Sequence, residues 1–100
     1  MINHISITGI LCEIENQESI YRNIKIKRNY KDVTGRYIED IIPCMMWSRN
    51  NKNKLFSFKT NSYVALDGRI ERDENGIHIV VEQIMYLASQ EVKYVSKEGV

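Results

Sequence analysis

The feature that most constrains the fold of this chain is a two-residue alternation of apolar and polar side chains. It is clearest in "IYRNIKIKRNY", where Ile20, Ile24 and Ile26 fall on one face of an extended strand and Lys25 and Lys27 on the other. Further segments of this kind are "INHISITGILCEI", "YIEDIIPCMMW", "SYVALDGRIER" and "IHIVVEQIMYLAS". The sequence therefore predicts five β-strands.

Turn-forming residues separate these segments. "KDVTGR" supplies Asp32, Thr34 and Gly35 between the second and third strands, and "ENG" precedes the fifth. Within the strands, we interpret Gly9 as a bulge or bend and Gly68 as a turn glycine. These positions divide the chain into short strands joined mostly by tight connections.

One segment, "NNKNKLFSFKT", does not alternate, and it favours a short helix that packs Leu55 and Phe58 inward. Three strands, a helix and two strands within about 90 residues predict the five-stranded Greek-key barrel of the OB-fold, an all-β fold with one short helix. Pro43 has no N–H, so we expect it at a strand edge or a bulge. We assign residues 1–88 to one barrel domain and residues 89–100 to a tail or an extra strand.

Several classes of protein do not fit this sequence. It has no stretch of about 18 apolar residues that would span a membrane, and no signal-peptide pattern, so we expect a cytoplasmic, nucleoid-associated protein. Cys12, Cys44, His4 and His78 lie too far apart for a zinc motif, so we expect no metal and no cofactor. We also expect no enzymatic activity, since the sequence lacks a nucleophile–base pair, paired carboxylates and a glycine-rich phosphate loop.

Charge is segregated along the chain although the net charge is only +1. Residues 22–59 contain ten basic and three acidic residues, a formal charge of +7, whereas the remaining residues carry −6. A local basic field suits a polyanion, because lysine and arginine release counterions from phosphates. The alternative is that solvated basic side chains simply crowd one segment.

The third predicted strand is apolar on both faces. Its two alternating sets are Ile42, Cys44 and Met46 on one face, and Ile41, Pro43, Met45 and Trp47 on the other. A barrel strand needs only one apolar face, so the second face is either covered or a binding surface. Trp47 is followed by the basic segment "SRNNKNK", a combination that suits unpaired bases stacking on the ring while cations contact phosphates. A subunit interface at Trp47 is the alternative.

These residues resemble the bacterial and phage single-stranded-DNA-binding protein family over residues 1–88. The resemblance rests on "MIN" with "ITGIL", on "IEDIIPCMMW", and on the ungapped spacing from Trp47 to "NSYVALDGRI". It implies that Trp47 and Tyr30 are base-stacking aromatics and that Arg28, Lys27 and Arg49 contact phosphates. It also implies a homodimer or homotetramer formed through the first strands.

The sequence departs from the family pattern in several places. Ile41 stands where the family usually has a stacking aromatic, Ile10 replaces a basic residue after Gly9, and the hairpin "RDENGIH" is short. Nothing in "SKEGV" resembles the family's acidic C-terminal tip. We therefore expect a short form that does not recruit replication enzymes through an acidic tail.

Further residues complete the predicted site. Tyr37 and Phe56 are candidate stacking residues because they lie in the basic segment, and Ile41 and Met45 are candidate apolar contacts. The remaining candidates for phosphate or groove contacts are Lys25, Lys52, Lys54 and Arg72. For Lys52 and Lys54 the alternative is solvation of the helix start, and for Arg69 and Arg72 it is pairing with neighbouring acids. We expect His78 to form a surface pair with Glu82.

The predicted function is non-enzymatic binding of single-stranded DNA with little sequence specificity, in DNA replication, recombination or repair. The alternatives are a primosomal accessory OB-fold protein and a protein-interaction OB module that docks a partner on Trp47 and Met45. A docking module has no need of the +7 segment. Stacking and phosphate contacts do not distinguish DNA from RNA, so RNA stays open as a ligand.

Overall fold

The computed structural model describes residues 3–89, without the side chain of Arg49. The elements are the strands β1 (Ile5–Leu11), β2 (Arg22–Lys31), β3 (Tyr37–Met46), β4 (Ser62–Asp73) and β5 (Gly76–Ser89), with the 3-10 helix η1 (Arg49–Asn51) and the helix α1 (Lys52–Phe56) between β3 and β4. The predicted order of strands and helix is confirmed. The predicted tail, except Ser89, lies outside the described residues, so its conformation stays a prediction.

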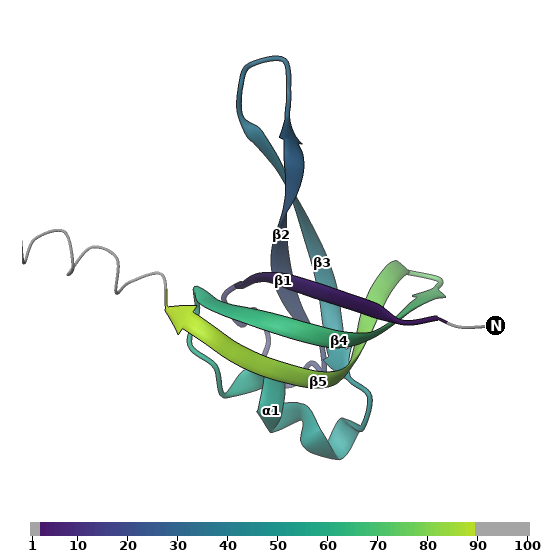
Figure 1. Ribbon diagram of the computed structural model, residues 1–100. Helices are drawn as coiled ribbons and strands as arrows, with labels where there is room; N and C mark the ends of the chain where they lie inside the picture. Colours follow the sequence, from purple (N-terminus) through teal and green to yellow (C-terminus); the bar gives the residue numbers. More distant parts are fainter. Residues whose placement is uncertain (1–2, 90–100) are drawn as a thin grey trace, which may run out of the picture.

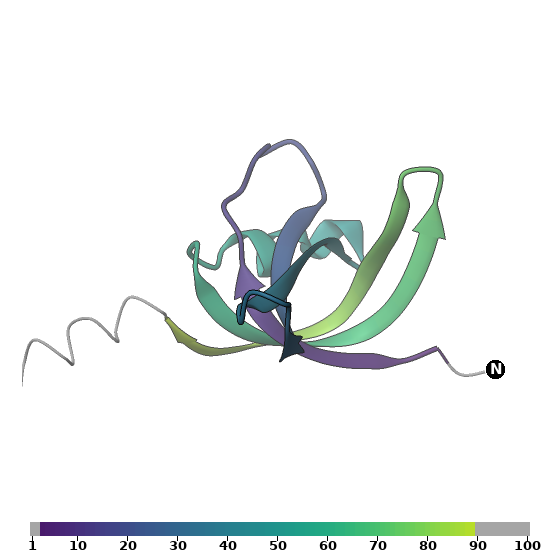
Figure 2. The ribbon, with the colours of Figure 1, turned by 90° about the horizontal axis from the view of Figure 1, so that it is seen from above.

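The five strands close into a barrel in the order β1-β2-β3-β5-β4, and they curve around a common interior (Figure 2). All pairs are antiparallel except β3 with β5, whose short parallel ladder joins Cys44–Met46 to residues 79–81. Closure pairs edges that isoleucine-rich strands would otherwise expose. The topology confirms the predicted five-stranded barrel with one short helix. In the part of the chain that the structure describes, no helix is long and apolar enough to cross a membrane.

Pro43 occupies the position in β3 where the lack of an N–H is tolerated. It pairs with Asn23 of β2, while the ladder to β5 begins only at Cys44. On the β5 side, Pro43 is therefore at an open edge, as its missing donor requires. The expectation of an edge position is confirmed.

The core forms from the inward residues of every strand, closed at one end by the helix. The fully packed members are Leu11, Ile24, Cys44, Met46, Leu55, Val64, Leu66, Ile79 and Val81. Leu55 of α1 belongs to this cluster, with Phe58 packed against it as predicted; Figure 1 shows α1 at the lower end of the barrel. Both cysteines are free thiols, and burial raises the pKa of Cys44 to about 12, which makes it an inert core residue.

Gly68 lies within β4 and not in a turn, so that prediction is wrong. The pairing of β4 with β5 shifts register between Asp67 and Gly68, and a Cβ at Gly68 would collide with the carbonyl oxygen of Val80. At Gly9, where a bulge or a bend was predicted, the β1–β4 ladder has no bulge, because its pairing continues through Gly9 without a shift. There a Cβ would lie 2.8 Å from the carbonyl oxygen of Lys25, so close approach of β2 requires the glycine.

Arg22 does not belong to the surface basic segment, because its side chain points into the protein and only 2% of the residue is exposed. Its guanidinium donates hydrogen bonds to three backbone carbonyls, those of Cys12 (3.0 Å), Leu55 (2.9 Å) and Phe58 (2.6 Å). These contacts tie the β1–β2 loop and the end of α1 to β2. The prediction that Arg22 contributes to the basic surface of residues 22–59 is therefore wrong, because its guanidinium stabilises the fold from inside the protein.

Beyond the barrel, β2 and β3 continue as a two-stranded arm (Figure 1). The turn at its tip is the predicted one, since Asp32 accepts hydrogen bonds from the backbone N–H of Thr34 and Arg36, and Gly35 has a φ of 84°. The side-chain bond from Thr34 and the backbone bonds lower the pKa of Asp32. The arm therefore ends in a well-defined turn, and it presents side chains to solvent on both faces.

Candidate nucleic-acid interface

Strand register brings the outward side chains of four strands onto one side of the barrel. Lys25 of β2 pairs with Ile41 of β3, while Met45 pairs with Val80 of β5, which pairs with Arg69 of β4. Paired residues project to the same side of a sheet. We call this surface the β3 face; its members are Lys25, Lys27, Ile41, Pro43, Met45, Trp47 and Arg69.

The predicted alternation along β3 is confirmed. Cys44 and Met46 are buried in the core, while Ile41 and Trp47 are each 61% exposed. The Trp47 N–H donates to the carbonyl of Val81 at 2.8 Å, which continues the β3–β5 ladder by one residue and fixes the backbone beneath the ring. The outward residues of β3 therefore form an apolar strip within the β3 face, with Trp47 at one end.

Arg69 is a residue of this face that the sequence prediction did not include. Its guanidinium carbon lies 5.5 Å from the centre of the Trp47 ring, a cation–π contact. Glu71 at 2.8 Å and Glu82 at 3.6 Å pair with the same guanidinium. The neighbouring acids were visible in the sequence and predicted an ion pair, but the contact with Trp47 depends on a ladder between strands distant in sequence. Arg69 thus holds the indole in place while much of the ring stays open to solvent.

The arm extends the β3 face with aromatic and basic groups that reach to the strand residues next to its tip turn. The ring centre of Tyr37 lies 5.3 Å from the ammonium of Lys27 and 5.2 Å from that of Lys31. Lys27 pairs with Glu39, two residues along from the Lys25–Ile41 pair, so these side chains share one side. The predicted residues Tyr37, Lys25 and Lys27 are therefore brought together with Ile41.

Arg28 and Tyr30 occupy the opposite face of the arm. Arg28 forms a bidentate ion pair with Asp40 at 2.8 and 2.9 Å, and it also donates to the Tyr30 hydroxyl at 2.7 Å. Asp40 is paired in register with Ile26, whose side faces away from Lys25 and Lys27. The bond from Arg28 lowers the pKa of Asp40, so the pair stays charged. The structure thus separates these two predicted residues from Trp47.

The residues predicted around the helix also do not form one site. Phe56 packs against the core, and the ammonium of Lys52 lies 4.5 Å from its ring centre while donating to the carbonyl of Gln17. Lys54 is exposed on α1, and Arg72 is exposed on β4 opposite Ile77. Arg49 lies in η1, and its side chain is outside the described part of the structure.

His78 is buried, with 7% of the residue exposed, so the predicted surface pair with Glu82 is wrong. Its ring packs edge-on against Tyr21, with 5.5 Å between ring centres. The ring nitrogens face Glu71 at 3.8 Å and Asp73 at 3.7 Å, whereas Glu82 pairs with Arg69. Alternation along β5 did not reveal this burial, because the residue that covers His78 comes from the β1–β2 loop.

A second concave surface adjoins Lys25 and Lys27. It is a groove of about 650 Å³, and its other lining residues are Thr8, Gly9, Ile10, Glu39, Tyr63 and Ala88. The two lysines therefore stand between this groove and the β3 face. Among residues 3–89, no group of His, Cys, Asp and Glu side chains is placed to hold a metal ion.

No protein-family model and no curated protein matches this sequence. Among solved structures, the chain is similar to a small single-stranded DNA-binding protein from Streptomyces coelicolor (TM-score 0.61, 11% identity, 87% of this chain and 95% of that chain). It is also similar to PriB from Ralstonia solanacearum (TM-score 0.61, 11% identity, 88% of this chain and 100% of that chain). A third similar structure is the Plasmodium falciparum SSB in complex with single-stranded DNA (TM-score 0.56, 13% identity, 88% of this chain and 96% of that chain).

These likenesses extend over nearly the whole barrel at low sequence identity, so they establish the fold. The class of protein that topology and comparisons define together is the OB-fold, a closed five-stranded barrel with one short helix. An OB-fold can bind several classes of ligand, so the ligand of this protein depends on the residues of the β3 face.

Proposed function

We propose that this protein binds single-stranded DNA without enzymatic activity and with little overall sequence specificity, in DNA replication, recombination or repair. The observation that carries the proposal is the exposed Trp47 at the end of an apolar strand face that also holds Lys25 and Lys27. Bases stack on Trp47 and Tyr37, while the lysines contact the phosphates. Ile41 and Met45 supply apolar contact to bases and sugars. Two of the similar structures support the same ligand, since one is a single-stranded DNA-binding protein and the other is an SSB in complex with single-stranded DNA.

A duplex is a poorer ligand for this surface. Its bases are already stacked on one another, so an exposed indole adds nothing to their stability, whereas an unpaired base gains about 1–3 kcal/mol on an aromatic ring. The face holds few polar groups aimed outward to read base edges, so most positions should accept any base. RNA offers the same bases and phosphates, and comparison of oligo-dT with oligo-U is the direct test between them.

Titration with oligo-dT should quench the intrinsic fluorescence of Trp47, which is the sole tryptophan. Because each phosphate contact on a single strand contributes a slope of about −0.7, contacts by Lys25 and Lys27 predict a slope of about −1.4 in log K against log salt. Affinity should then fall about sevenfold between ~50 and ~200 mM salt. Absence of quenching at low salt, with the protein folded, would contradict stacking and favour a protein partner docked on Met45 and Trp47.

Replacing Lys25 with glutamine should reduce the magnitude of that salt slope by about 0.7, because one phosphate contact is lost. Lys59→Gln is a matched control, since Lys59 is exposed in the α1–β4 connection and lies outside the β3 face. Both slopes are measured with a fluorescently labelled oligo-dT. An equal reduction in both variants would mean that the field of the whole protein, and not the β3 face, sets the affinity.

We further propose that the protein is a homodimer or homotetramer that pairs through β1. The register of β1 with β2 is limited to Ile10 and Leu11, so within the described chain residues 5–8 of β1 are paired only on the β4 side. An open strand edge is a template for pairing with a second copy. Sedimentation equilibrium would test this, and a monomer at micromolar concentration would refute it.

A further inference from the structure

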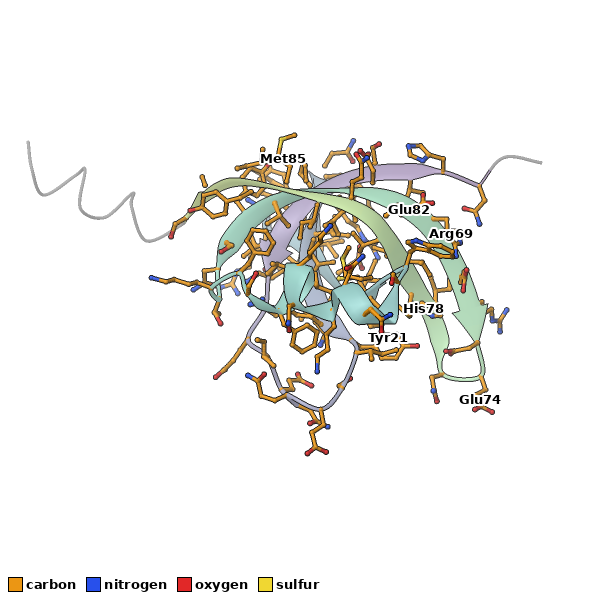
Figure 3. All side chains as sticks on the ribbon, turned by 90° about the horizontal axis from the view of Figure 1, so that it is seen from below. Tyr21, Arg69, Glu74, His78, Glu82 and Met85 are labelled. Carbon is orange, nitrogen blue, oxygen red and sulfur yellow. The ribbon has the colours of Figure 1, made fainter. Side chains whose placement is uncertain are left out.

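A small pocket lies beside the β3 face, where the β1–β2 loop approaches the β4–β5 hairpin. Its volume is about 240 Å³, below the ~300–1,000 Å³ typical of sites for drug-sized ligands. The residues that shape it are Tyr21, Pro43, Asp73, Asn75, Ile77 and His78. Figure 3 shows Tyr21 beside His78, with Arg69 and Glu82 close by on the same side of the barrel. The pocket therefore suits a small, flat group and not an extended ligand.

The walls of the pocket are built to contact a planar ring. Tyr21 and His78 meet edge to face at an interplanar angle of 81°, and Pro43 and Ile77 add apolar surface. Of these residues, Tyr21 and Ile77 are exposed, and exposed aromatic and apolar surfaces contact the face of an unpaired base. His78 is fixed by burial, since it is enclosed between Tyr21 and β4. The pocket is thus a preformed cavity, and little conformational entropy is lost in ordering it when a ligand binds.

The polar side chains at the pocket include one carboxylate, that of Asp73, beside the amide of Asn75 and the ring of His78. Asp73 lines it with a carboxylate, whose Oδ1 already accepts the backbone N–H of Asn75 at 2.8 Å, while Oδ2 lies 3.7 Å from His78 Nδ1. A carboxylate repels phosphate but accepts hydrogen bonds from an exocyclic amino group, as in contacts of aspartate with cytosine N4. A base therefore fits with its edge inward and its phosphate away from the Asp73 carboxylate.

The pocket lies within reach of a strand that stacks on Trp47. Met45 pairs with Val80; Trp47 is two residues after Met45, and His78 is two residues before Val80. At about 3.3 Å per residue these four steps place the two side chains about 13 Å apart along the same sheet. A few nucleotides of an extended single strand span this distance, so both positions can be occupied at once.

We infer that this pocket takes one unstacked base of the bound strand and prefers a base with an exocyclic amino group, such as cytosine, over thymine. The inference rests on the proposed single-strand binding and adds to it one position of base preference. Thymine presents carbonyl oxygens where cytosine presents its amino group, so it places acceptors against the Asp73 carboxylate. One charge-assisted hydrogen bond gained and one repulsion avoided predict a preference of about three- to tenfold.

The test compares oligo-dT of about 12 nucleotides, within the ~4–16 that an OB-fold covers, with the same oligomer carrying one dC at a central position. The wild type should bind the dC oligomer about three- to tenfold more tightly. Asp73→Asn should bring the ratio close to one, because the negative charge that favours an amino group over a carbonyl is lost, and Tyr21→Ala should do the same by opening a wall.

Glu74→Gln is the matched control, since it removes the same charge from the hairpin tip outside the pocket lining (Figure 3). Both variants can strengthen binding of every oligomer by reducing repulsion, but only Asp73→Asn should change the dC-to-dT ratio. Quenching of Trp47 by both oligomers with equal affinity would overturn the pocket assignment and leave the proposed function standing. Absence of binding by either oligomer would instead overturn the proposed function, and the pocket inference with it.

Discussion

Replacing Trp47 with alanine should weaken binding of oligo-dT by about 5- to 150-fold, the equivalent of the ~1–3 kcal/mol that one stacked base contributes. Trp47 is 61% exposed at the end of the β3 face, and its ring contacts Arg69 on one side. Truncation therefore removes a preformed stacking surface without opening the core. Binding is measured by the anisotropy of a labelled oligonucleotide, because the variant has lost its tryptophan.

Trp47→Phe is the graded control, because a smaller ring in the same position should recover most of the affinity. Thermal unfolding of both variants should stay close to that of the wild type, since exposed side chains contribute little to stability. If Trp47→Ala and Trp47→Phe both bind oligo-dT as tightly as the wild type, the single strand does not stack on residue 47. The aromatic contact would then have to come from Tyr37 on the arm.

Replacing Arg22 with methionine should lower the free energy of unfolding by about 3 kcal/mol, and the Tm by about 12–24 °C. The carbonyls of Cys12, Leu55 and Phe58 each accept a hydrogen bond from this guanidinium. Being backbone groups, they remain when the arginine is removed, and buried acceptors without donors are costly. Methionine keeps a similar apolar length, so the loss measured is mainly that of the hydrogen bonds.

Arg72→Met provides the same substitution at an exposed position of β4 and should change stability by no more than about 0.5 kcal/mol. At a temperature where Arg22→Met is still folded, the salt slope of oligo-dT binding should equal that of the wild type, because the buried guanidinium does not reach a phosphate. A Tm within about 4 °C of wild type would show that the hydrogen bonds of Arg22 contribute little to stability. A reduced salt slope would show that Arg22 contacts a phosphate.

The strands, the tip turn and the helix were predictable because their causes are local. Alternation over a few residues assigns Ile24 to the core and Lys25 to solvent, and the Asp32–Gly35 segment carries its own turn chemistry. The double apolar face of β3 and its adjacent tryptophan likewise needed no partner strand to be noticed. The sequence by itself therefore determined the barrel and the surface on which Trp47 stands.

Tertiary structure alone decided which side chains meet, because a local sequence pattern does not determine cross-strand register or loop packing. The paired strands place Arg69 against Trp47, and the β1–β2 loop buries His78 beneath Tyr21. The same packing removes Arg22 from the basic surface, and the pleat of the arm turns Arg28 away from the β3 face. Each of these outcomes joins residues distant in sequence, so each follows only from the closed barrel.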